Sequence, residues 1–233
     1  MSRSTLRGSA ITAEIRKAQA AAAAAPVAPK KGAKDKPAAA AAAPKGAGEI
    51  RIIGGQWKRT RLPVAQRPGL RPTPDRVRET LFNWLGQDLS GWRCLDAFAG
   101  TGALGLEAAS RGAASVQLVE SDAALVAQLQ VLQAKLQASA VRVQRGDGVA
   151  ALKQAAPASV DLVLLDPPFD GDLFVPALQA AAKAVAAEGF VYLEAPRAWA
   201  DGELTAMGLA VHRHLKAGAV HAHLLRPLAA AAV

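Results

Sequence analysis

The chain beyond Trp92 alternates between short apolar runs and longer stretches whose apolar side chains recur every three or four residues. The short runs predict β-strands at Arg93–Phe98, Ser115–Glu120, Val141–Arg145, Val160–Asp166 and Phe190–Glu194. The periodic stretches predict helices at Ala103–Arg111, Ala123–Gln137, Gly148–Ala155 and Phe174–Ala186. Strands that alternate with helices in this way form a parallel sheet covered on both faces.

Hairpin patterns stand at both ends of this alternation. Leu209–Leu215 and Val220–Arg226 flank Gly218 and indicate an antiparallel hairpin at the C-terminal end. Near the other end, short apolar or basic segments flank Gly54-Gly55 within residues 51–63, which is typical of a hairpin. The expected fold is therefore α/β, with a mainly parallel seven-stranded sheet, a C-terminal antiparallel hairpin, and an N-terminal β-hairpin and helix before the sheet.

The helix that follows the first hairpin has a recognisable start. Thr73 is expected as its N-cap and Pro74 as its first helical residue. Its apolar stripe consists of Val77, Leu81, Phe82 and Trp84–Leu85, and Arg76 and Arg78 are expected to lie off that stripe.

Composition divides the 233 residues into three parts. Residues 1–48 contain no aromatic residue and are rich in Ala, Lys and Pro, so we expect a disordered tail, with an organelle transit peptide as the alternative. Residues 49–90 are expected to form a basic hairpin and helix, and residues 91–233 the domain of alternating strands and helices. The single Cys and the lack of a roughly 20-residue apolar run favour a cytoplasmic protein without a disulfide framework or a membrane span. A monomer is expected, although no sequence feature determines the oligomeric state.

Positive charge is concentrated at the front of the chain. Residues 1–80 hold 17 Lys or Arg against 5 Asp or Glu, whereas the remainder holds 11 against 14. This asymmetry favours contact between the front and a polyanion, although for the tail itself a purely solubilising role is equally possible. The candidate phosphate-binding residues before the first long strand are Arg51, Lys58, Arg59, Arg61, Arg67, Arg71, Arg76 and Arg78.

A glycine-rich segment follows the first predicted strand. Gly100 and Gly102 permit a tight turn, and the helix after them presents free N–H groups to a ligand. Glu120 ends the next strand, where a carboxylate can accept hydrogen bonds from both ribose hydroxyls of a nucleoside cofactor. The glycines could also serve packing alone, and the spacing does not separate a dinucleotide from S-adenosylmethionine.

The segment Asp166-Pro167-Pro168-Phe169 distinguishes between these two cofactors and favours S-adenosylmethionine. It follows a strand and so lies at the carboxyl edge of the sheet, where open α/β sheets place their sites. The exocyclic amine of a base is a poor nucleophile, because its lone pair is delocalised into the ring. The Asp166 carboxylate and the Pro167 carbonyl can accept its two N–H groups and aim the lone pair at a methyl sulfonium, while Phe169 stacks on the base.

Four segments carry a resemblance to a known family: residues 51–57, 69–83, 96–108 and 166–169. In this order they closely resemble the bacterial 16S ribosomal RNA guanine-N2 methyltransferases that modify guanine 966, over about residues 49–227. The resemblance implies a class I methyltransferase Rossmann-like fold and S-adenosylmethionine as the methyl donor. It also implies that the partner is 16S rRNA in the small ribosomal subunit or its assembly intermediate, methylated by direct transfer to nitrogen.

The resemblance also assigns roles to residues by position. The residues expected at the methionine end of the cofactor are Asp96, Ala99, Gly100, Thr101 and Gly102. Glu120 is expected to hold the ribose, and Asp147 to meet the adenine amine. The residues expected to hold the target base are Asp166, Pro167, Pro168 and Phe169. The Ala/Lys/Pro extension departs from the short leader of the family and is left without a role.

Two other functions remain as alternatives. A DNA adenine-N6 methyltransferase shares the chemistry of the Asp-Pro-Pro-aromatic segment, but it normally carries an added target-recognition domain. A non-catalytic RNA-binding or ribosome-assembly protein on a methyltransferase fold would use the basic front alone. The intact glycine turn, Glu120 and Asp166 argue against that second alternative.

Three further features are interpreted as structural. Cys94 lies within a strand and is expected to be a small buried hydrophobe. The four histidines form two His-x-His pairs, at 212 and 214 and at 221 and 223, and each pair would share one face of a strand. No acid or cysteine accompanies them in sequence, so no metal is expected. Glu194 ends a strand at the same edge as Asp166, and a capping or pairing role is favoured for it.

Overall fold

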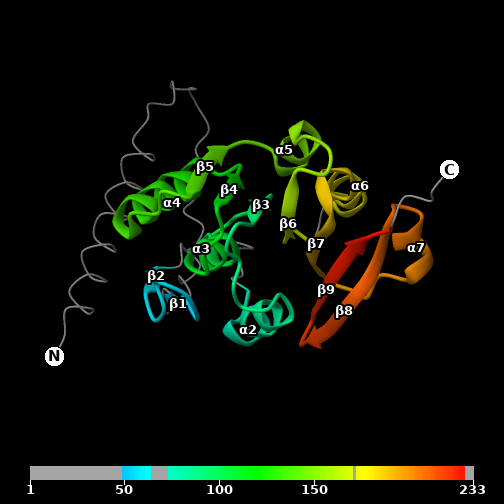
Figure 1. Ribbon diagram of the computed structural model, residues 1–233, viewed down its shortest axis with the longest axis horizontal. Helices are drawn as coiled ribbons and strands as arrows, with labels where there is room; N and C mark the ends of the chain where they lie inside the picture. The colour runs from blue at the N-terminus through cyan, green and yellow to red at the C-terminus, as the bar shows by residue number, and fades with distance from the viewer. Residues whose placement is uncertain (1–48, 64–72, 170–171, 229–233) are drawn as a thin grey trace, which may run out of the picture.

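The computed structural model describes residues 49–63, 73–169 and 172–228 (Figure 1). A seven-stranded sheet has the order β5-β4-β3-β6-β7-β9-β8, in which β9 is antiparallel to β7 and β8 and the other pairs are parallel. This confirms the predicted α/β fold with its C-terminal hairpin. The strands are β3 (Arg93–Asp96), β4 (Ser115–Glu120), β5 (Val141–Arg145), β6 (Val160–Leu165), β7 (Val185–Ala195), β8 (Leu209–Ala217) and β9 (Val220–Pro227).

One strand begins earlier than its sequence predicts. β7 starts at Val185 rather than at Phe190, because the β6–β7 ladder contains an irregularity. Val160 pairs with Val185, and the next pair is Leu162 with Phe190. The residues between Val185 and Phe190 are two alanines, an exposed Glu188 and a glycine, which lack a strand-like hydrophobic pattern.

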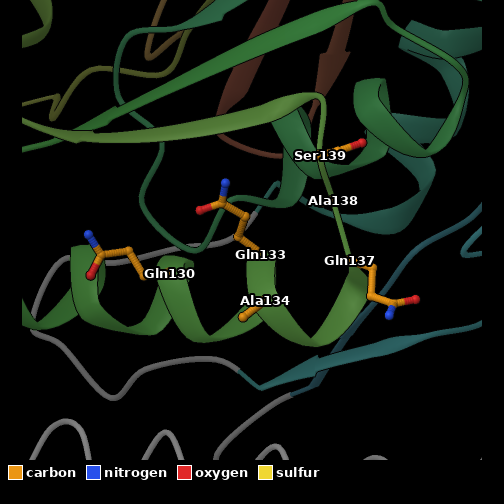
Figure 2. A pocket seen from close by; sticks show the side chains of 6 residues that line it. All are labelled: Gln130, Gln133, Ala134, Gln137, Ala138 and Ser139. Carbon is orange, nitrogen blue, oxygen red and sulfur yellow. The ribbon is translucent and has the colours of Figure 1, made fainter.

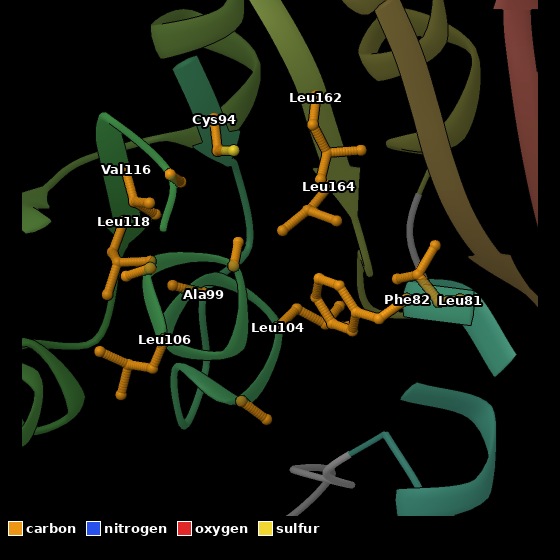
Figure 3. Packing of buried hydrophobic residues seen from close by; sticks show 14 of the residues in the cluster. Leu81, Phe82, Cys94, Ala99, Leu104, Leu106, Val116, Leu118, Leu162 and Leu164 are labelled. Carbon is orange, nitrogen blue, oxygen red and sulfur yellow. The ribbon is translucent and has the colours of Figure 1, made fainter. Parts of the chain in front are cut away.

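Helices cover both faces of the sheet. The helices are α2 (Asp75–Trp84), α3 (Ala103–Ser110), α4 (Ala123–Leu136), α5 (Gly148–Gln154), α6 (Phe174–Ala184) and α7 (Asp201–Thr205). One core cluster joins the sheet to α2, α3 and α4, and a second joins its other face to α5, α6 and α7. Leu81 and Phe82 of α2, Leu104 of α3 and Leu164 of β6 belong to the first cluster (Figure 3).

The N-terminal hairpin pairs β1 (Glu49–Arg51) with β2 (Arg61–Pro63) and packs on the first cluster. Gly54-Gly55 lie in the connecting loop, which is closed by hydrogen bonds between Ile52 and its partners Thr60 and Arg59 at 2.9 and 2.8 Å. Ile50, Ile52 and Leu62 are buried. The hairpin therefore shares the core of the sheet.

The start of α2 differs from its prediction by one residue. Pro74 occupies the N-cap position and its carbonyl accepts from the N–H of Arg78 at 3.1 Å. Thr73 makes no capping hydrogen bond, because its buried side chain is hydrogen-bonded to Glu194 of β7. The first turn of α2 is thereby attached to the carboxyl edge of the sheet.

A bulge in the C-terminal hairpin separates one histidine pair. The β8–β9 register shifts between Val211 and Arg213. As a result, the His212 ring lies 5.6 Å from that of Phe190, while the His214 ring lies 4.7 Å from that of His223. The expectation that His212 and His214 share a face was therefore wrong. Along the described ranges, no helix combines the length and apolar character needed to cross a bilayer.

Candidate active site

The two sequence motifs lie on neighbouring parallel strands. β3 pairs with β6, and Asp96 is opposite Leu164, so the glycine turn after β3 and the diproline segment after β6 leave the sheet at the same edge. β4 lies on the other side of β3, which makes this edge the point where the strand order reverses. Open α/β sheets bind ligands at such a point.

The glycine turn adopts the left-handed backbone that its sequence predicts. Gly100 and Gly102 have φ angles of 52° and 79°, and Gly102 precedes the first residue of α3. Of the residues expected at the methionine end, Gly100 is partly exposed, whereas Asp96, Ala99, Thr101 and Gly102 are buried. A Cβ on Gly102 would lie 2.5 Å from Leu129 Cδ2, so this glycine is also needed for packing.

Glu120 lies directly beside the turn. Its Oε2 accepts from the Gly100 N–H at 2.8 Å, and its Oε1 accepts from the Asp122 N–H at 2.8 Å. The Ala99 N–H donates to the carbonyl of Val119 on the same strand at 2.9 Å. The end of β4 and the glycine turn therefore form one hydrogen-bonded unit, with a carboxylate at its centre.

The two other acids expected at the cofactor differ in exposure. Asp96 is only 2% exposed, and its Oδ2 accepts from the Gly105 N–H at 3.0 Å. Burial raises the pKa of Asp96 to about 7, against the opposing effect of the hydrogen bonds from Gly105 and Phe98. Asp147 is exposed at the end of β5, where it caps α5 by accepting from the Ala150 N–H at 2.7 Å.

The diproline segment presents an acid and an aromatic ring. Burial, followed by the charges of Glu194 and Asp96, raises the pKa of Asp166 well above its usual range. Pro167 is buried and Pro168 is exposed. Phe169 is 42% exposed, and its ring lies 6.2 Å from that of Phe174, which lies 6.1 Å from that of Trp199. The exposed face of Phe169 is available for stacking.

A buried polar group beside Asp166 was not recognised as such from the sequence. Glu194 is 3% exposed, accepts from the Tyr192 hydroxyl at 3.0 Å and is hydrogen-bonded to Thr73. Leu165 pairs with Leu193, so Asp166 and Glu194 follow at matching positions on adjacent strands. The predicted pairing role for Glu194 is consistent with these contacts. In the sequence, the only indication of the contacts was that Glu194 ends a predicted strand.

The candidate RNA-binding residues fall into four groups, the last of which is Arg78 alone. Within the described segments, Lys58, Arg59 and Arg76 are exposed and form no ion pair. Arg51 and Arg61 are exposed but paired, Arg51 with Asp75 at 3.7 Å and Arg61 with Glu49 at 2.9 Å. Arg67 and Arg71 lie outside the described residues, as does the 1–48 tail.

Arg78 requires a correction. Its side chain is fully buried, so the expectation that it contacts RNA was wrong. Its guanidinium donates to the carbonyls of Thr73 and Arg51 at 3.2 and 2.9 Å and to Glu107 Oε2 at 3.4 Å. Arg78 is therefore a structural residue that joins α2, β1 and α3.

Glu107 is the centre of that structural group. The fully buried carboxylate accepts from the N–H groups of Ile53 and Gly54, both at 2.8 Å, and from the guanidinium of Arg111 at 2.8 Å. Two cations and two backbone donors thus compensate one buried charge, as buried carboxylates require. α3, which starts at the glycine turn, therefore also holds the loop of the N-terminal hairpin.

A pocket on α4 is remote from these groups. Figure 2 shows Gln130, Gln133, Ala134 and Gln137 along the helix and Ala138 and Ser139 in the turn after it. This turn leads into the start of β5, at the edge of the sheet opposite to Glu120. In the described part of the chain, no three His, Cys, Asp or Glu side chains are arranged to hold a metal ion.

Known proteins match this chain in sequence. The family described as Conserved hypothetical protein 95 matches residues 50–226. Ribosomal RNA small subunit methyltransferase D of Escherichia coli K12 is 52% identical over 124 residues, which are 53% of this chain and 62% of that protein. The Haemophilus influenzae protein of the same name is 44% identical over 134 residues, or 56% and 69% of the two chains.

The solved structures extend the match. That of yhhF from Escherichia coli, described as a methyltransferase, has a TM-score of 0.66 and 41% identity. It covers 78% of this chain and 100% of the other, whereas the sequence match spans about 62% of the length of the curated Escherichia coli relative. These matches confirm the resemblance that the motifs indicated, and the chain belongs to the family described as Conserved hypothetical protein 95.

Proposed function

We propose that this protein methylates the exocyclic N2 of a guanine of the 966 type in 16S ribosomal RNA, with S-adenosylmethionine as donor. One observation carries the proposal: the glycine turn and the Asp166 segment leave adjacent parallel strands at one edge of the sheet. A donor and an acceptor bound at these two loops would lie side by side. The names of the relatives support ribosomal RNA of the small subunit as the substrate.

The residues at the glycine turn fit a nucleoside cofactor. Glu120 and Asp147 place carboxylates at the ends of the neighbouring strands β4 and β5, where they can accept from ribose hydroxyls and an adenine amine. The positive φ of Gly100 brings the backbone of the turn to this edge without a side chain. S-adenosylmethionine, when bound, supplies a methyl group activated by a sulfonium.

The Asp166 segment fits a guanine amine. The Asp166 carboxylate and the Pro167 carbonyl are acceptors for its two N–H groups, and Phe169 offers a face for the ring. Holding the amine by both hydrogens fixes its direction toward the donor, and alignment of this kind accounts for a large share of the barrier in group transfer. The target base must leave its stack to reach the loop.

The test is methyl transfer to RNA with the position of the product determined. The purified full chain, S-adenosylmethionine and small subunits from cells that lack the modification are incubated, and the 16S RNA is mapped by mass spectrometry. We expect one methyl group on a guanine N2. Asp166→Asn should lose transfer by about 10²-fold or more while it retains cofactor binding, and the exposed Asp201→Asn serves as its control. A methyl group on adenine or cytosine, or methylation of DNA alone, would contradict the proposal.

A further inference from the structure

Three acids lie at the carboxyl edge of the sheet. Side chains alternate along a strand, and Cys94, Leu164 and Tyr192 all belong to the core cluster on the α2 side. Asp96 and Glu194, two positions further along β3 and β7, consequently face the same side. Asp166 is the first residue after β6 and lies close enough to interact with the charges of both. Asp96 and Glu194 are almost fully buried.

The donors near these acids are distributed unequally. Burial raises the pKa of Glu194, as it raises that of Asp166. At Glu194 the hydrogen bonds with Tyr192 and Thr73 and the charge of Arg78 oppose this shift and favour the ionised form. Burial and Glu194 keep the pKa of Tyr192 well above its usual range, so Tyr192 remains a neutral donor. Within the described chain, no side chain donates to Asp166. Glu194 is therefore the member of the pair whose negative charge is better compensated by hydrogen-bond donors.

We propose that Glu194 is a positioning residue that makes Asp166 the proton acceptor of the methyl-transfer step. This inference rests on the proposed function and adds a role for an acid that does not touch the substrate. A fixed negative charge at the neighbouring register position disfavours a second negative charge. Asp166 therefore binds a proton more readily than an ordinary aspartate.

The transfer step produces the proton that this arrangement would take up. The lone pair of the amine nitrogen forms the C–N bond, the C–S bond breaks and its electron pair stays on sulfur. The nitrogen then carries one positive charge and a surplus proton, which passes to the Asp166 carboxylate and afterwards to solvent. A more basic carboxylate accepts this proton earlier and more readily, because the efficiency of a general base rises with its pKa toward the working pH.

The decisive variant is Glu194→Gln, which removes the charge and keeps a similar shape. Single-turnover methyl transfer is measured against pH, so that product release does not mask the chemical step. We expect the acidic limb of the profile to move to lower pH by about one unit or more, with little change in the affinities for RNA and cofactor. Glu188→Gln, an exposed substitution on the same strand, is the matched control and should leave the limb in place.

A merely structural Glu194 would give a different result. Its loss would lower stability or affinity, but the acidic limb of the pH profile of Glu194→Gln would lie at the same pH as in the unmodified protein and in Glu188→Gln. That outcome overturns the proposal. Glu194→Asp retains the charge and should keep the limb near its original pH.

A second measurement needs no variant of Glu194. Carbon-13 NMR follows the carboxyl groups of the RNA-free protein, and Asp166→Asn identifies the signal of Asp166. We expect Asp166 to titrate clearly above the ordinary value of about 3.9, and titration near that value overturns the proposal even if Glu194→Gln does not fold. If Asp166 titrates above its ordinary value but the protein methylates no RNA, the proposed function is refuted and the inference about Glu194 and Asp166 is not.

Discussion

Glu120 Oε2 and the backbone nitrogen of Gly100 lie 2.8 Å apart, so the acid expected at the ribose is already attached to the glycine turn. Its other oxygen is occupied by the N–H of Asp122. That oxygen also accepts from the Ser121 hydroxyl at 3.3 Å, so the second lone pair of Oε2 is the one that can accept from a further hydroxyl. Glu120 can thus hold the turn in shape and contact a ribose at the same time.

Glu120→Gln should weaken cofactor binding. The amide has one acceptor oxygen in place of two, and it places an N–H₂ group opposite a backbone or ribose donor. A hydrogen bond to a charged group contributes about 1.5–3 kcal/mol, so the affinity for S-adenosylhomocysteine should fall roughly tenfold or more, as measured by calorimetry. The exposed Glu79→Gln should bind like the unmodified protein. Equal affinities for both variants would remove Glu120 from the cofactor site.

Replacement by Ala should affect stability at Arg78 and RNA binding at Arg76, although the two residues lie only two positions apart on α2. Arg78→Ala leaves the buried Glu107 with one cation fewer and should lower the free energy of unfolding by about 3–5 kcal/mol. Arg76→Ala, on the exposed face, should change it by less than about 0.5 kcal/mol and should weaken RNA binding. Urea unfolding and filter binding measure both effects. Similar stability losses in the two variants would contradict this account of α2.

Charge reversal at the hairpin loop should reduce the salt dependence of RNA binding. Lys58→Glu with Arg59→Glu removes two exposed cations that have no ion-pair partner in the described chain. Each lost phosphate contact lowers the slope of log K against log salt by about 0.7–0.9. Lys153→Glu on α5, on the opposite face, is the control. An unchanged affinity and slope would exclude the hairpin loop from the interface.

Asp96 should make stability depend on pH between about 4 and 7. Burial raises its pKa from 3.8 to about 7, so the folded protein binds this proton more tightly than the unfolded chain. The contribution is complete below pH 3.8 and is lost as the pH rises through 7. Asp96→Asn does not titrate, so between pH 4 and 8 its free energy of unfolding should rise by roughly 4 kcal/mol relative to that of the unmodified protein. Parallel curves from urea unfolding would contradict the raised pKa.

Gly102 and Gly202 should respond differently to Ala. At Gly102 the φ of 79° and the 2.5 Å approach of Leu129 Cδ2 should cost about 1–3 kcal/mol. At Gly202, in α7, a Cβ would meet no atom within 4 Å, and the smaller entropy of the unfolded chain should add about 0.4–1 kcal/mol. Thermal unfolding distinguishes the two. A stabilised Gly102→Ala would show that the turn tolerates a side chain.

The regular elements and the glycine turn were predictable because each depends on local pattern. The predicted bounds of β4 and β5 are those of the structure, since their hydrophobic runs end abruptly at polar or glycine residues. The bulges in β7 and β8 were not predictable, because they arise from pairing between strands that lie far apart in the sequence.

The error at Arg78 has a different origin. Position 78 shares the spacing of Leu81, Phe82 and Leu85, so helical periodicity places it on the buried face of α2. Its charge favoured a surface role, and its partner Glu107 lies 29 residues away and cannot be identified from the sequence. The same holds for Glu194, whose partner Thr73 comes from another part of the chain.

The short helix α3 bears on both halves of the proposed reaction. It begins directly after Gly102. At its other end the Ser110 carbonyl accepts from the Gln56 N–H and the Ser110 hydroxyl donates to the Gly54 carbonyl, both at 2.7 Å. Its eight residues correspond to about 12 Å. The length of α3 therefore fixes the distance between the hairpin loop, which would contact the phosphates, and the glycine turn, which would bind the methyl donor. An insertion of one residue would rotate the two ends by about 100° relative to each other and would uncouple them even if every side chain were retained.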